Sequence, residues 1–74
     1  MNRHQTAQYY LDKINAAKAP LALFVVNGAI KTTKVTTNLF HEALSKTPQR
    51  LMGVYDGECL LKWLEEDLEY MGIA

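Results

Sequence analysis

The segment formed by residues 21–30 constrains the fold of this chain more than any other. LALFVV, residues 21–26, is a continuous apolar run with a β-branched end, and Asn27-Gly28 follows it directly. Asn-Gly is the dipeptide that most readily supplies the two positive φ angles of a type I′ turn, so the segment predicts a β-hairpin. Because the first strand is apolar on both faces, we expect it in the interior of a sheet.

Closing the hairpin over Asn27-Gly28 pairs Val26 with Ala29 and assigns each side chain to a face. The returning strand, residues 29–36, is rich in threonine, and Lys31 and Lys34 protect it as an edge strand against unwanted pairing. The two predicted faces carry Leu21, Leu23, Val25 and Ile30 on one side, and Phe24, Val26, Ala29 and Lys31 on the other.

Three segments show helical spacing of apolar residues. The first covers residues 5–18 and is stopped by Pro20. The second covers residues 39–46 and ends near Thr47-Pro48, with N-cap candidates at Thr36, Thr37 and Asn38. The third covers residues 58–71, with Asp56 as its expected cap and Gly72 at its end.

Residues 50–55 predict a third strand, closed by Asp56-Gly57, although Gly53 in its middle weakens the pattern. The order is then helix, strand, strand, helix, strand, helix. We predict a single α+β domain over residues 1–74, in which helices pack on one mostly antiparallel sheet. The expected strand order is second, first, third, with the third strand antiparallel to the first.

The bulk properties favour a small folded intracellular protein. The chain has 74 residues and is 49% hydrophobic, which is enough apolar surface for a core. A single cysteine, Cys59, excludes an internal disulfide and any four-cysteine metal site, and it fits a reducing cytoplasmic setting. No stretch approaches the roughly 18 apolar residues of a membrane span, and the polar N-terminus does not resemble a signal peptide. We therefore expect a complete, soluble, cytoplasmic chain.

Motifs for catalysis or metal binding are incomplete. His41-Glu42-Ala43-Leu44-Ser45 begins like the zinc-binding HExxH motif but has serine where the second histidine is required. Cys59, expected in the first turn of the last helix, is either a buried structural thiol or a thiol activated by the helix dipole; its apolar neighbours favour the former. We predict neither enzyme activity nor a cofactor.

Charge is divided by position along the chain. Residues 1–50 carry seven Lys or Arg residues against Asp12 and Glu42, whereas residues 51–74 carry six acids against Lys62. The halves sum to +5 and −5, so a net charge of zero hides a dipolar molecule. Such asymmetry bears on partners and association rates.

The acids of the last helix give the leading hypothesis for function. They would form an electrostatic patch that meets a basic groove on a larger protein, with aromatic residues as anchors. The chain would then be a small non-enzymatic regulator or inhibitor of the kind that phages and mobile elements encode. The alternative is an ordinary solvated helix face. The residues concerned are Glu65, Glu66, Asp67 and Glu69 for the patch, with Asp56 and Glu58 near its start, and Trp63 and Tyr70 for the anchors.

Two alternatives belong to other classes. A nucleic-acid accessory protein would use Lys31, Lys34, Lys46 and Arg50, although few cations and a sequence pI near 6.7 argue against it. A homodimeric structural protein would pair through the second face of the sheet, at Phe24 and Val26, if no helix covers that face.

Overall fold

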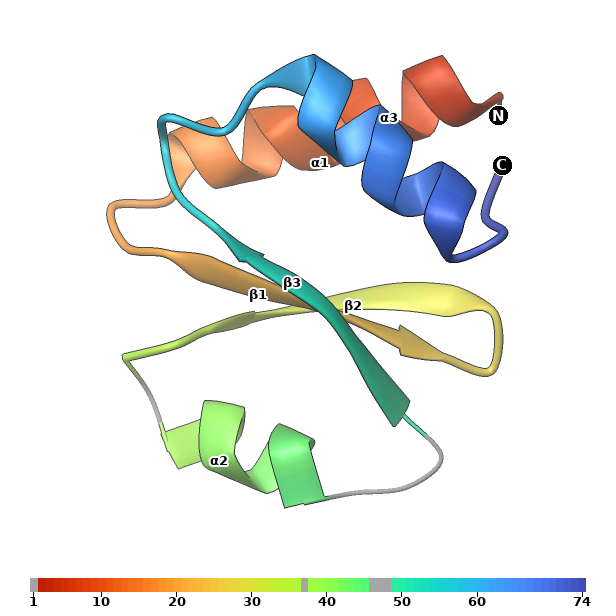
Figure 1. Ribbon diagram of the computed structural model, residues 1–74. Helices are drawn as coiled ribbons and strands as arrows, with labels where there is room; N and C mark the ends of the chain where they lie inside the picture. The colour runs from red at the N-terminus through yellow and green to blue at the C-terminus, as the bar shows by residue number, and fades with distance from the viewer. Residues whose placement is uncertain (1, 37, 46–48) are drawn as a thin grey trace.

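The computed structural model describes residues 2–36, 38–45 and 49–74, which form three helices and three strands in the predicted order (Figure 1). Helices α1 and α3 lie side by side on one face of the sheet, and α2 lies on the other (Figure 1). The α+β prediction is confirmed. The elements are α1 (Arg3–Ala16), β1 (Leu21–Val26), β2 (Ala29–Lys34), α2 (Asn38–Ser45), β3 (Gln49–Tyr55) and α3 (Leu61–Tyr70).

The sheet has the predicted strand order β2-β1-β3, and β1 is antiparallel to both neighbours. Val26 pairs with Ala29 as expected. Asn27 has a φ of 51° and Gly28 a φ of 81°, the two positive angles that a type I′ turn needs. The local chemistry of the Asn-Gly dipeptide thus sets the register of the hairpin, and β1 occupies the interior position.

The main core lies between the sheet and the pair α1 and α3. Ile14 from α1, Leu23 from β1 and Leu64 from α3 have no solvent exposure. Full burial of such a side chain stabilises the fold by about 1.5–3 kcal/mol. The remaining buried members of this cluster are Ala7, Leu21, Tyr55, Cys59 and Leu68.

The second face of the sheet is covered in part by α2. Phe24 on β1 is only 1% exposed, and its ring centroid lies 6.3 Å from that of Phe40 on α2. The chain therefore covers with its own helix the residue that the dimer hypothesis placed on an open face. Dimerisation through Phe24 and Val26 stays a prediction, but the buried Phe24 side chain is not exposed to a second copy of the chain.

Some helix boundaries differ from the sequence prediction for identifiable reasons. Helix α1 begins at Arg3 instead of residue 5 because Asn2 caps it: its side chain accepts from the Gln5 backbone N–H at 2.9 Å, and Gln5 Oε1 accepts from the Asn2 backbone at 3.1 Å. The helix ends at Ala16, before an extended Ala17. The predicted end of the second helix near Thr47-Pro48 lies outside the described residues.

Helix α3, in contrast, begins later than predicted, at Leu61, and the expectation that Asp56 caps it is wrong. Asp56 Oδ1 instead accepts from the Glu58 backbone N–H at 3.0 Å, which fixes a turn ahead of the helix. The predicted end at Gly72 is confirmed. Gly72 has a φ of 74°, and the Ile73 N–H donates to the Leu68 carbonyl at 2.9 Å in a Schellman motif.

None of the helices in the described ranges combines the length and the apolar character needed to cross a bilayer.

Candidate functional site

The geometry of α3 decides how its acidic and aromatic side chains are presented. Leu64 and Leu68 are buried and fix the core-facing stripe of the helix. Successive residues rotate by about 100° around a helix axis, so residues adjacent in sequence lie on different sides of it. The predicted acidic patch, which is continuous in the sequence, is therefore divided among different sides of α3.

Each acid of α3 has its own surroundings. Glu65 faces α1, where its Oε1 lies 2.5 Å from His4 Nδ1. Glu66 is exposed, with Lys62 Nζ at 4.0 Å, and Glu69 is also exposed. Asp67 is half-buried on the side that faces β3, where it accepts a hydrogen bond from the Tyr55 hydroxyl. The four predicted acids therefore do not form a single contact surface.

The predicted aromatic anchors lie on one side of α3. Trp63 is 52% exposed and Tyr70 is 81% exposed. Trp63 and Tyr70 are seven positions apart, so they lie on nearly the same side of the helix. Asp67, four positions after Trp63, lies on this side too. We call this side the aromatic flank, and its members are Trp63, Asp67 and Tyr70.

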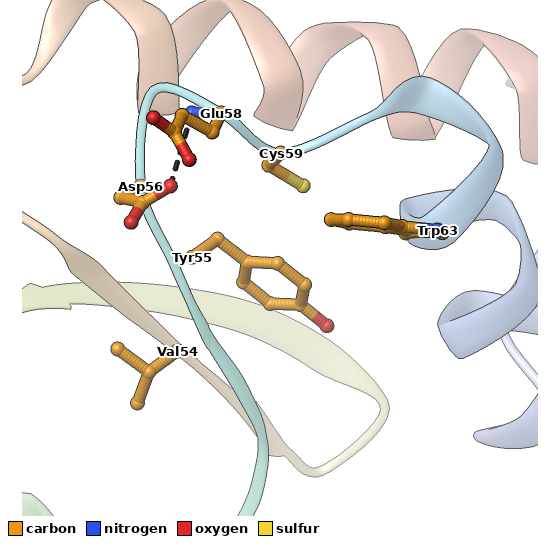
Figure 2. Close-up of a pocket in the computed structure, with 6 residues that line it drawn as sticks. All are labelled: Val54, Tyr55, Asp56, Glu58, Cys59 and Trp63. Atoms are coloured by element: carbon orange, nitrogen blue, oxygen red, sulfur yellow. Dashed lines mark hydrogen bonds between the residues drawn. The ribbon is translucent and has the colours of Figure 1, made fainter.

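A cleft lies between Trp63 of the aromatic flank and the end of β3 (Figure 2). Its volume is about 320 Å³. Figure 2 shows the carboxylates of Asp56 and Glu58 at one end of the cleft and Trp63 at the other, with the Cys59 side chain directed toward Trp63. The lining residues are Val54, Tyr55, Asp56, Glu58, Cys59 and Trp63.

Gly53 and Tyr55 build the wall of the cleft on the side of β3. A Cβ atom at Gly53 would lie 2.7 Å from the Tyr55 hydroxyl oxygen, so only glycine leaves room for the Tyr55 ring to lie across this position. The ring then reaches Asp67, and this hydrogen bond ties β3 to the aromatic flank. The glycine that weakened the strand pattern in the sequence thus has a packing role.

The cleft lies in a negative electrostatic environment. Burial raises the pKa of the Cys59 thiol above its ordinary value, and the charges of Asp67 and Asp56 raise it further. The pKa of Tyr55 is also raised, first by burial and then by the hydrogen bond to Asp67 and its charge. Asp67 therefore acts on two separate groups that line the cleft, whereas Asp56 acts on Cys59.

Cys59 is a buried thiol and not an activated one. It is 8% exposed, it precedes α3 instead of lying in its first turn, and its raised pKa disfavours the nucleophilic thiolate. Among the described residues, no group of three or more His, Cys, Asp and Glu side chains could hold a metal ion. The Cys59 thiol contacts the Leu60 carbonyl at 3.7 Å, and the hydrogen bonds among the described residues do not join it to a basic side chain.

The structure does not gather the predicted nucleic-acid residues. Lys31 pairs with Phe24 and Lys34 with Leu21, so the two lysines lie on opposite faces of β2. Arg50 lies on β3, at the other edge of the sheet. Lys46 lies outside the described residues. Nucleic-acid binding stays a prediction, without a continuous basic surface formed by the three cations that are described.

Sequence reasoning named most of the acids and aromatic residues of this region but missed the cleft. Val54 was not singled out, and Tyr55, Cys59 and Trp63 were not placed together. The cleft depends on how the turn after β3 directs the chain into α3, and Asp56 was expected to cap the helix. A signal was present in the sequence: Asp56-Gly57 is a turn dipeptide and predicts that the helix starts later.

No protein-family model, no curated protein and no solved structure matches this chain. The case for a function therefore rests on the chemistry and geometry of its own residues.

Proposed function

We propose that this chain is a small non-enzymatic protein-binding module that regulates or inhibits a larger protein by docking on it. The docking surface is the aromatic flank of α3 together with the cleft beside β3. The module would act in the cytoplasm, in line with its single cysteine. An origin in a phage or mobile element fits its small size, and this origin remains a proposal.

The exposure of the aromatic flank is the observation that carries this proposal. Trp63 and Tyr70 expose 52% and 81% of their surface, and Leu60, which precedes the helix, is also exposed. Burial of apolar surface is favourable by about 25 cal/mol for each Å² removed from water, and these exposed side chains do not gain this free energy in the free chain. Tyr and Trp are also the residue types that most often supply binding energy in interfaces. Binding of a partner that covers this flank would gain this free energy of burial.

The acids would contribute mainly to encounter with the partner. Glu66 and Glu69 are exposed on the outer side of α3, where they can steer a basic surface toward the aromatic flank. Glu65 and Asp67 have partners within the chain and hold α3 in place. The acidic-patch hypothesis is thus refined: the exposed acids Glu66 and Glu69 guide association, and the aromatic residues Trp63 and Tyr70 supply contact.

Photocrosslinking in the host cell tests the proposal. The photoreactive residue p-benzoylphenylalanine would replace Trp63 in one variant and Tyr9 in the other. Tyr9 is the matched control because it is an aromatic residue with a similar exposure, 48%, but lies on α1.

We expect a defined crosslinked protein species for the variant at position 63 and none for the variant at position 9. Equal crosslinking at both positions, or none at position 63, would refute the proposed docking surface. A crosslink removed by nuclease treatment would instead support the nucleic-acid alternative. Circular dichroism of both variants verifies that each is folded.

A further inference from the structure

The cleft beside β3 differs from an ordinary apolar hollow in having carboxylates at one end. Trp63 and Val54, both about half exposed, supply apolar surface on its walls. Asp56 and Glu58 lie together at the end away from Trp63 (Figure 2). The ion pairs among the residues that the structure describes include neither Asp56 nor Glu58. The cleft therefore combines apolar walls with negative charge that no cation of the described chain neutralises.

This combination matches one type of side chain. Arginine has a long aliphatic stem that packs on apolar surface and a charged head that pairs with carboxylates. Its planar guanidinium can bond two carboxylate groups through separate N–H donors. A neutral polar side chain could pack on the apolar walls, but it would leave the carboxylates without an opposite charge. Burial is the first cause of the raised pKa of Cys59, and the charges of Asp67 and Asp56 add to it.

We propose that the cleft between β3 and α3 receives an arginine side chain of the partner protein. The stem packs on Trp63, and the guanidinium lies between the carboxylates of Asp56 and Glu58. This inference rests on the proposed function and specifies the chemistry of the partner: an arginine on its surface enters the cleft while neighbouring residues cover the aromatic flank.

The single tryptophan of the chain provides a direct reporter of this event. The ¹⁵N-labelled protein would be titrated with the peptide acetyl-Ala-Arg-Ala-amide while the Trp63 indole N–H and the amides of Asp56 and Glu58 are followed by NMR. The matched probe is the same peptide with citrulline, which keeps the shape of arginine but has no charge. The variants are Glu58→Gln at the cleft and, as a control, Glu42→Gln on α2, where Glu42 is exposed and away from the cleft.

We expect the arginine peptide to shift all three signals and the citrulline peptide to bind about tenfold more weakly. Glu58→Gln should weaken binding of the arginine peptide about two- to fivefold, and Glu42→Gln should leave it unchanged. Added salt should weaken binding of the arginine peptide only. Equal binding of both peptides, or equal effects of both substitutions, would overturn the proposal.

Failure of this inference is distinguishable from failure of the proposed function. A protein crosslink at position 63, combined with no response to the arginine peptide, would retain the docking surface and remove arginine as its ligand. If the peptide shifts the same signals when Asp56→Asn and Glu58→Gln are combined, the carboxylates do not hold the guanidinium, and the inference is wrong.

Discussion

The two edges of the sheet flank the same central strand, yet they differ in chemistry on the face that holds Ala22 and Phe24. Ala22 on β1 pairs with Thr33 on β2 and with Val54 on β3. Phe24 pairs with Lys31 on one side and Leu51 on the other. At these two positions, β2 presents polar or charged side chains and β3 presents exposed apolar ones. Opposite Val25, on the other face, the order is reversed, with Ile30 on β2 and Arg50 on β3.

This difference separates a protected edge from an edge suited to contact. Lysine and threonine on an edge strand discourage pairing with other chains. Exposed apolar residues favour contact, and on β3 one of them, Val54, lines the cleft. In the proposed function, the acids Asp56 and Glu58 would restrict which partner can approach. The comparison thus favours the side of β3 and α3 as the proposed interaction surface.

The largest predicted effect on stability tests the packing of β3 against the aromatic flank. Gly53 and Thr32 both pair with Leu23, so they are matched positions on the two edges. Gly53→Ala places a Cβ against Tyr55 and should lower the free energy of unfolding by about 1–3 kcal/mol. Thr32→Ala should change it by about 0.5 kcal/mol. Urea denaturation measures both values, and equal losses would contradict the packing role of Gly53.

A smaller effect on the free energy of unfolding is expected when a tyrosine hydroxyl is removed on the β3 side or on the β2 side of the sheet. The Tyr55 hydroxyl bonds a carboxylate, whereas the Tyr10 hydroxyl reaches the Ile30 carbonyl on β2 at a long 3.4 Å. Tyr55→Phe should cost about 1 kcal/mol of unfolding free energy because it leaves Asp67 half-buried without this donor. Tyr10→Phe should cost less. If Tyr10→Phe proves the more damaging of the two, Tyr55 does not secure α3.

Alkaline pH should act on the same region. Folding raises the pKa values of Cys59 and Tyr55 above their ordinary values of 9.0 and 10.0. The folded state therefore favours the neutral forms. Their contribution to stability is fully present below the ordinary pKa values, and it is lost as pH rises through the pKa values of the folded state. The free energy of unfolding should decline above about pH 9. Cys59→Ala and Tyr55→Phe should each make this decline shallower, and an unchanged slope in both variants would contradict the assignment.

Short-range chemistry made much of the fold predictable from the sequence. Asn27-Gly28 determined the hairpin register because few dipeptides adopt two positive φ angles. The apolar run of β1 indicated its interior position, and Gly72 marked the end of α3 because it adopts a positive φ there. Each of these features depends on a few neighbouring residues.

Features that depend on tertiary contacts were less accessible. The cover of Phe24 by α2 requires two segments distant in sequence to meet. The role of Gly53 depends on the ring of Tyr55, and that ring is directed by Asp67 on another element. The division of the acids around α3 was accessible in principle from helical geometry, but their continuity in the sequence suggested a single patch.

The measurement that tests the central claim most directly compares the two edges in binding. Val54→Lys and Thr33→Lys introduce the same charge at matched positions opposite Ala22. Each would be combined with p-benzoylphenylalanine at position 63, after thermal melts verify that both variants fold. We predict that Val54→Lys abolishes the protein crosslink and that Thr33→Lys retains it. Retention of the crosslink in both variants, or its loss only with Thr33→Lys, would show that the β3 side is not the docking surface.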